Sequence, residues 1–177
     1  YQSVGILDKK GVGIAFNTPS NIGQDFSDRP YFPVALRGET YISDVLKSRS
    51  PNADGSYPPI TVIAIPMRTD DGSVAGVMIA TVDMQVFSQK YLAGLATDAT
   101  HPYLLTREGL VAAHPNKSLI FDSSLASNPV FKKFISVQES IEYYPWQGGQ
   151  RLGISRKNPM SGLTMVIGGD VAKLFAP

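Results

Sequence analysis

Pairs of short apolar runs joined by glycine-containing turns recur along this chain, and they constrain its fold more than any other feature. In the first half, VGILDKKGVGIAF and VIAIPMRTDDGSVAGVMIATVD each contain an apolar run, a charged turn with Gly and a second apolar run. The pattern returns in YLLTREGLVAAHP and LGISRKNPMSGLTMVIGGD. Hairpin turns often need positive φ, which Gly adopts at little steric cost. The pattern predicts antiparallel β-hairpins arranged as a weak internal repeat.

The segments between these hairpins have a different character. PYFPVALRG and NPVFKKFIS are expected to form short helices, the second with Asn128 as its cap and Pro129 at its first position. SRSPNADGSYPP is typical of a long surface loop. DMQVFSQKYLAGLA has apolar residues at helical spacing and follows Asp83, so it is the natural connector between the halves. We therefore expect an α+β fold with two similar units, each a sheet flanked by short helices.

Composition excludes several classes of function. The chain has 177 residues, 43% of them hydrophobic, which is ample for a buried core. It has no cysteine, which excludes disulfides, thiolate metal sites and cysteine nucleophiles, and two histidines leave little material for a zinc site. The 16 basic and 15 acidic residues are spread without runs of one sign, so no nucleic-acid partner is expected. We expect no cofactor.

No apolar run approaches the roughly 20 residues that a membrane-spanning helix needs. The opening YQSVGILDKK also lacks the form of a signal peptide. We therefore expect a soluble segment excised from a longer protein.

Motifs of common enzyme classes are also missing. The chain contains no G-x-S-x-G elbow, phosphate loop or H-E-x-x-H helix, and GVGIAF lacks the third glycine of a dinucleotide fingerprint. Asp25, Asp28 and His114 could serve a hydrolytic domain. The favoured interpretation places the two aspartates in an ion-paired or solvated loop, and it gives His114 a hydrogen-bond partner at the end of a strand. We expect this segment not to be an enzyme.

The stretch QDFSDRPYFPVALRGETYISD contains the most suggestive group of side chains. The guanidinium of Arg29 is a planar fork of donors that suits a carboxylate, and Tyr31 and Phe32 can wall a pocket beside it. The alternative is that Arg29 pairs with Asp25, Asp28 or Asp44 while both aromatic residues belong to the core. The residues alone leave these two interpretations open.

The order of these elements resembles the double Cache domain, an extracellular sensing module of bacterial membrane receptors. The resemblance rests on DFSDRPYFPVALRGETYISDV, the proline-rich loop, ITVIAIPMRTDDGSVAGVMIATVDM and PYLLTREGLVAAHPN. It implies two PAS-like units with antiparallel sheets and short helices, stacked on a long N-terminal helix that this sequence lacks. The membrane-distal, ligand-binding unit would be residues 1–92, and the membrane-proximal unit would be residues 93–177.

The resemblance also implies a ligand site in the distal unit. In amino-acid-binding members an arginine and an aromatic residue hold the ligand carboxylate, and these positions match Arg29 and Tyr31, the latter where a tryptophan is usual. A tyrosine and two aspartates hold the amine. The tyrosine matches Tyr41 and one aspartate matches Asp83, whereas the other aspartate is replaced by Ser43. Losing one carboxylate weakens the case for a buried ammonium, so we expect a carboxylate or other small polar ligand. The candidate ligand-binding residues are Arg29, Tyr31, Phe32, Tyr41, Ser43, Asp44 and Asp83.

As a member of that family, the segment would be the periplasmic or extracellular part of a bacterial inner-membrane receptor. It would be anchored in the membrane through segments not present here, and homodimer formation is a possibility left open by the sequence. Its ligand would be a carboxylate or an amino-acid-like molecule, and the conformational change would reach a cytoplasmic output domain. Chemoreceptor, sensor histidine kinase and diguanylate cyclase all remain open as the output. The alternative is a structural or dimerisation module whose pocket has degenerated.

Overall fold

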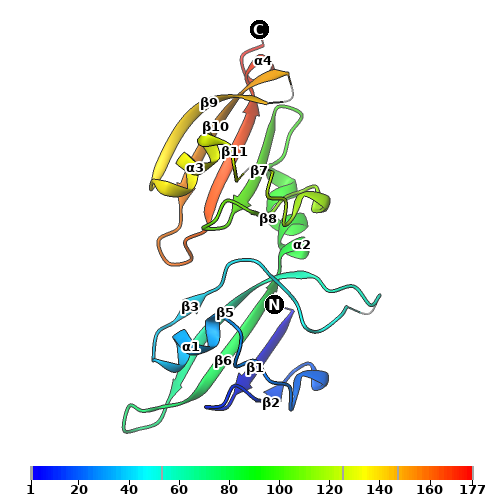
Figure 1. The fold of residues 1–177 in the computed structure, drawn as a ribbon. Helices are drawn as coiled ribbons and strands as arrows, with labels where there is room; N and C mark the ends of the chain where they lie inside the picture. Colours follow the sequence, from blue (N-terminus) through cyan, green and yellow to red (C-terminus); the bar gives the residue numbers. More distant parts are fainter. Residues whose placement is uncertain (1, 53, 125, 147, 177) are drawn as a thin grey trace. The chain divides into compact units, whose positions relative to one another are not determined.

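The computed structural model describes residues 2–52, 54–124, 126–146 and 148–176. By its internal contacts the chain divides into two compact units, within residues 1–83 and 84–177. Each unit contains one antiparallel sheet with a few short helices (Figure 1). The expected α+β fold is therefore confirmed. The helical segment that follows Asp83 is grouped with the second unit.

The first unit is a sheet of six strands whose spatial order is β2-β1-β6-β5-β3, with β4 paired to β5 beside β3. Its elements are β1 (Ser3–Leu7), β2 (Gly13–Phe16), the 3₁₀ turn η1 (Pro19–Asn21), α1 (Tyr31–Leu36), β3 (Tyr41–Ile42), β4 (Leu46–Lys47), β5 (Pro59–Arg68) and β6 (Val74–Asp83). Both predicted hairpins are present, since β1 pairs with β2 and β5 pairs with β6. The glycines of their turns have positive φ, 90° at Gly11 and 84° at Gly72, as predicted.

Gly11 also allows a close approach that a larger residue would block. A Cβ at this position would lie 2.7 Å from the backbone nitrogen of Ser27. The neighbouring Val12 forms an isolated antiparallel bridge with Asp25. The β1–β2 turn thereby fixes the chain just before Arg29 and α1.

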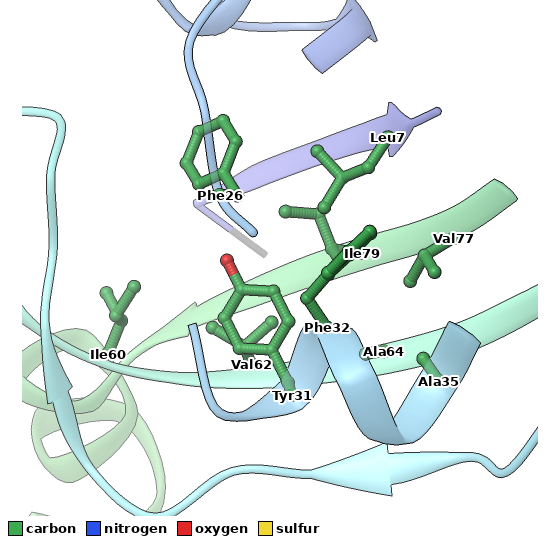
Figure 2. Packing of buried hydrophobic residues seen from close by; sticks show 10 residues of the cluster. All are labelled: Leu7, Phe26, Tyr31, Phe32, Ala35, Ile60, Val62, Ala64, Val77 and Ile79. Atoms are coloured by element: carbon green, nitrogen blue, oxygen red, sulfur yellow. The ribbon is translucent and has the colours of Figure 1, made fainter. Parts of the chain in front are cut away.

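The core of the first unit lies between the sheet and α1. Figure 2 shows Tyr31, Phe32 and Ala35 projecting from α1 toward aliphatic residues of the sheet. The sheet contributes Leu7 from β1, Ile60, Val62 and Ala64 from β5, and Val77 and Ile79 from β6. Phe26 stacks on Phe16, with ring centroids 5.6 Å apart. The loop before α1 is therefore part of the packed structure.

The second unit repeats this arrangement. Its sheet has the order β8-β7-β11-β10-β9, which is the first sheet's order with each strand replaced by its counterpart in chain order. Its elements are α2 (Met84–Phe87), the π-helical turn η2 (Ser88–Leu92), the 3₁₀ turn η3 (Ala93–Leu95), β7 (Thr100–Leu105), β8 (Val111–Ala113), the 3₁₀ turn η4 (Lys117–Leu119), α3 (Pro129–Ser136), β9 (Glu139–Trp146), β10 (Gly149–Lys157), β11 (Thr164–Asp170) and α4 (Val171–Leu174). The predicted internal repeat is confirmed at the level of topology.

Helix α3 begins as its sequence predicts. The side chain of Asn128 accepts a hydrogen bond from the Val130 amide at 3.0 Å, and Pro129 occupies the first helical position. Its buried face presents Phe131 and Phe134 to Tyr144 of β9. These three aromatic residues form the centre of the second core.

Within the described residues, no helix is both long and apolar enough to cross a membrane.

Candidate functional site

The first unit contains a cavity of about 230 Å³. Strands of the sheet form its floor, and the start of α1 and two loops form its walls. The first loop runs from Phe16 to Arg29, and the second is the serine- and proline-rich segment after β4. The lining residues are Gln2, Ser3, Phe16, Thr18, Asn21, Phe26, Arg29, Tyr31, Leu46, Ser48, Arg49, Ser50, Pro51, Asn52, Ile60, Ile79 and Thr81.

Two arginines face this cavity. Arg29 is half-buried, and its Nη2 donates to the backbone oxygen of Lys47 at 3.0 Å. Arg49 donates to the backbone oxygen of Asp25 and forms an ion pair with Asp28. Burial lowers the pKa of Arg29, and the positive charge of Arg49 lowers it further. The two guanidinium groups are therefore close enough to repel each other, and both stay charged at physiological pH.

The cavity has no acidic side chain among its described lining residues. Asp28 compensates Arg49 from outside this lining, and the Asp25 carboxylate is turned to the Ser27 amide, which donates to it at 2.8 Å. A site with two guanidiniums and no carboxylate is electropositive, so it favours an anionic guest.

Tyr31 belongs both to the core and to the wall of the cavity. Only 2% of its surface is exposed, and Figure 2 shows its hydroxyl directed away from α1 toward Phe26. Burial raises the pKa of Tyr31 to about 12, although the charges of Arg29 and Arg49 act in the opposite direction. The phenol is thus neutral beside two cations and can donate a hydrogen bond to an acceptor in the cavity.

Hydrogen bonds hold the remaining polar walls in place. The Ser3 amide donates to Thr81 Oγ1 at 2.9 Å, which joins β1 and β6 at the floor. Ser50 Oγ donates to Asn21 Oδ1, and Gln2 Nε2 donates to Asn52 Oδ1 at 3.0 Å. The loop after β4 is therefore tied to η1 and to the start of the chain, which gives the cavity a defined wall.

The structure brings Arg29 and Tyr31 together at this cavity, whereas the other candidate residues are not among its lining. Phe32 is buried in the core. Ser43 is completely buried, and its hydroxyl accepts from the Val62 amide at 2.9 Å while donating to the Asp44 backbone oxygen at 2.8 Å. Tyr41 lies on edge strand β3 and packs against the core. A ligand contact for these residues and for Asp44 stays a prediction.

Asp83 lies at the end of β6, next to the cavity. It is paired with Ile60 across β5 and β6, and directly paired residues project to the same face of a sheet. It also continues the alternating row of Ile79 and Thr81, two residues that line the cavity. Its side chain is thereby placed on the cavity face, although a ligand role stays a prediction.

Sequence reasoning missed Arg49. The segment SRSPNADGSYPP has the composition of a surface loop, and it does connect β4 to β5 as a loop. The available signal was an arginine flanked by serines 20 residues after Arg29, which by itself does not predict convergence. The hydrogen bonds of Arg49 to Asp25 and Asp28 create the convergence, and they depend on tertiary structure.

The three groups considered for hydrolysis each have a structural partner. Asp28 pairs with Arg49, and Asp25 accepts from Ser27. His114 Nδ1 accepts from the Asn116 amide at 2.8 Å, directly after β8. The strand-end interpretation of His114 is therefore confirmed, as is the ion-paired loop for Asp28. In the described parts of the chain, no cluster of three or more His, Cys, Asp or Glu residues could hold a metal ion.

Comparison with known families gives a match over the whole chain. The double Cache family model, described as a Cache domain, matches residues 1–177. No curated protein matches the sequence.

Solved structures of similar fold come from several receptors. The ligand-binding domain of the Pseudomonas aeruginosa amino acid chemoreceptor PctB, in complex with L-Arg, is 16% identical, with a TM-score of 0.72 over 100% of this chain and 74% of that one. The extracellular domain of the histidine kinase rpHK1S-Z16 is 21% identical, with a TM-score of 0.73 over 98% and 73%. An extracellular ligand-binding receptor from Desulfohalobium retbaense is 16% identical, with a TM-score of 0.75. The match covers 95% of this chain but only 30% of that one.

Proposed function

This chain belongs to the Cache domain family, and we propose that it is the extracytoplasmic sensor domain of a transmembrane receptor, with the cavity of its first unit as the ligand site. The similar solved domains support this function, since they are described as extracellular or ligand-binding parts of chemoreceptors and a histidine kinase. The missing cytoplasmic part would be a chemoreceptor, histidine kinase or diguanylate cyclase output. No catalysis is required of this segment.

The observation that carries the proposal is that Arg29 and Arg49 both line a cavity whose described lining has no carboxylate. The repulsion between the two guanidiniums is relieved when an anion binds between them, so the empty site is less favourable than the filled one. Charge-assisted hydrogen bonds to a carboxylate are among the strongest that side chains make. Tyr31 adds a neutral donor at the same wall.

The ligand is accordingly a small carboxylate. A cavity of about 230 Å³ suits a compact metabolite and is smaller than the pockets of drug-sized molecules. PctB was solved with L-Arg, but in this chain Ser43 replaces one aspartate of the expected amine clamp, and its hydroxyl is already engaged with Val62 and Asp44. Asp83, on the cavity face at the end of β6, would accept from a hydroxyl or other donor of the ligand. A hydroxy acid fits these groups better than a plain α-amino acid.

Signalling would follow from differential binding. The loop that carries Arg49 and the segment that carries Arg29 come from separate parts of the first unit, and a carboxylate held by both favours the arrangement in which they lie close together. A ligand shifts a conformational equilibrium only by its preference for one of the two states. Anchoring through membrane segments outside this chain, a periplasmic location and homodimerisation belong to the same proposal.

A thermal-shift screen of the 177-residue domain against carboxylates, amino acids, amines and purines tests this function. A ligand present at 100 times its dissociation constant stabilises the folded state by about 2.7 kcal/mol, which raises the melting temperature by several degrees. We expect hits among carboxylates and none among simple amines. A flat response to all four classes, or hits confined to amines, would contradict an anion-binding sensor and favour a module with a degenerate pocket.

A further inference from the structure

Asp28 acts on the first cavity although it is not one of the lining residues. Its carboxylate accepts a hydrogen bond from Nη2 of Arg49 and forms an ion pair with it. In the chain it directly precedes Arg29, which carries the other guanidinium of the cavity. The Asp28 side chain is 65% exposed, whereas that of Arg49 is 32% exposed. Asp28 therefore compensates a cavity residue from the solvent side.

The negative charge of Asp28 also reaches the inner wall of the cavity. Burial and the charge of Arg49 lower the pKa of Arg29, and the charge of Asp28 opposes them. Burial raises the pKa of Tyr31 to about 12, and Asp28 acts in the same direction while the two arginines oppose it. One carboxylate thus partly offsets two guanidinium charges at the place where an anionic ligand would lie.

The other charged groups of this region are placed differently. Asp25 is exposed, and its carboxylate accepts from the Ser27 amide at 2.8 Å. Lys47 is exposed as well. Asp83 lies on the cavity face at the end of β6 and is a further negative charge there. None of these groups adds a buried positive charge to the two guanidiniums.

The second unit shows that the shared topology does not itself impose this charge pattern. It has its own cavity, of about 80 Å³, whose described lining includes His101, Tyr103, His114 and Asp122 but no arginine or lysine. The combination of two arginines and one ion-paired carboxylate is therefore a property of the side chains of the first cavity, and a single substitution can change it.

We propose that Asp28 is a specificity-determining residue, which restricts the first cavity to acids with one carboxylate by neutralising one of its two arginines. This inference rests on the proposed function and deepens it. The two guanidiniums and the ion-paired carboxylate sum to one positive charge. One ligand carboxylate is therefore matched, whereas a second would lack a counter-charge in a partly buried site and would be repelled by Asp83. A cavity of about 230 Å³ has room for small acids of either kind, so charge makes the selection.

Matched pairs of acids test this role of Asp28. Lactate and malate form one pair, and propionate and succinate form another, since the second acid of each pair has one more carboxylate on the carbon skeleton of the first. Each acid would be titrated calorimetrically into the 177-residue domain at pH 7.5 and equal ionic strength. The quantity compared is the ratio of the two dissociation constants within a pair. In the parent chain we expect the monocarboxylate to bind about fivefold more tightly than the dicarboxylate.

Asp28→Asn keeps an oxygen that can accept from Arg49 but removes the negative charge. We expect this variant to shift the ratio toward the dicarboxylate by about fivefold, and by less at high salt, because the group is partly exposed and screened. Asp25→Asn is the matched control, since it removes a negative charge from the same loop and keeps an acceptor for Ser27; it should leave the ratio within about twofold. A role of Asp28 in positioning Arg49 alone would weaken both acids alike and leave the ratio unchanged.

Three results would overturn the specificity role while the acids still bind, so the proposed function would stand. They are tighter binding of the dicarboxylate by the parent chain, an unchanged ratio in Asp28→Asn, and an equal shift in Asp25→Asn. An absence of binding by all four acids would overturn it as well, and the thermal-shift screen would then decide separately whether the proposed function holds.

Discussion

At the scale of single residues, burial sets the chemistry of both cavities. It keeps Tyr31 and Tyr103 neutral by raising their pKa values, and it lowers the pKa values of His101 and His114. Arg29 differs, because it stays charged although burial and the nearby positive charge of Arg49 both lower its pKa. The first cavity is thus permanently positive.

The histidines make a prediction about stability and pH. Since burial lowers both pKa values below the ordinary value of about 6.5, the unfolded chain binds more protons than the folded chain as the pH falls below that value. The free energy of unfolding should therefore decrease from pH 7.5 to pH 5.5. In the double variant His101→Gln, His114→Gln this decrease should be much smaller, because the chain has no other histidine.

Urea unfolding at pH 7.5, 6.5 and 5.5, followed by circular dichroism, measures this effect. The carboxylates with lowered pKa values, Asp25 and Asp71, titrate below this range and so do not interfere. An equal loss of stability in the double variant and in the parent chain would show that the buried imidazoles are not its source.

At the scale of helices and strands, local patterns predicted most of the fold. The hairpins follow from apolar runs around turns with Gly11, Gly72 and Gly109, all of which have positive φ. Helix α3 follows from Asn128 and Pro129. Strand β9 was not predicted, because ESIEYYPW mixes charged residues, aromatic residues and a proline, as edge strands often do. Its place in the sheet depends on pairing with β10, which is not a local property.

The outer face of the second sheet carries an exposed apolar row. Ile141, Ile154 and Ile167 are paired across β9, β10 and β11, and between 42% and 66% of each is exposed. Contiguous exposed apolar residues often mark a surface that another element covers. This row is where we expect the long helix that the family resemblance implies to pack.

Strand β10 offers a test of how closely α3 packs on its sheet. A Cβ at Gly153 would lie 2.5 Å from Cζ of Phe134, which is fully buried. Gly153→Ala should therefore lower the free energy of unfolding by about 1–3 kcal/mol, because the aromatic cluster must shift. Gly149→Ala, in the same strand, should change it by less than about 1 kcal/mol, since its nearest neighbouring atom would lie at 3.8 Å.

Chemical denaturation of the two glycine variants beside the parent chain makes the comparison. Equal effects of the two substitutions would mean that Phe134 does not pack on Gly153 as the structure describes.

At the scale of the whole molecule, one topology occurs twice and each copy contains a cavity. The repeat was predictable because both halves have the same order of hairpin, helix and hairpin. The contents of the cavities were less predictable. Arg29 and Tyr31 stand out in a short motif, whereas Arg49 and the aromatic cluster around Tyr103 converge only through tertiary contacts. Sequence therefore singled out two residues that line the first cavity, Arg29 and Tyr31, but not the other residues that complete the lining of either cavity.

The central claim is that the first cavity recognises a carboxylate through its arginines, and calorimetric titration tests it most directly. The carboxylate that stabilises the domain most in the screen would be titrated into the parent chain, Arg29→Ala and Arg37→Ala. Arg37 is the matched control, because it is exposed, pairs with Glu39 and lies outside the cavity lining. We expect Arg29→Ala to weaken binding at least tenfold and Arg37→Ala to leave it within twofold. Binding by Arg29→Ala within a factor of two of the parent chain would contradict the assignment of this cavity as the ligand site.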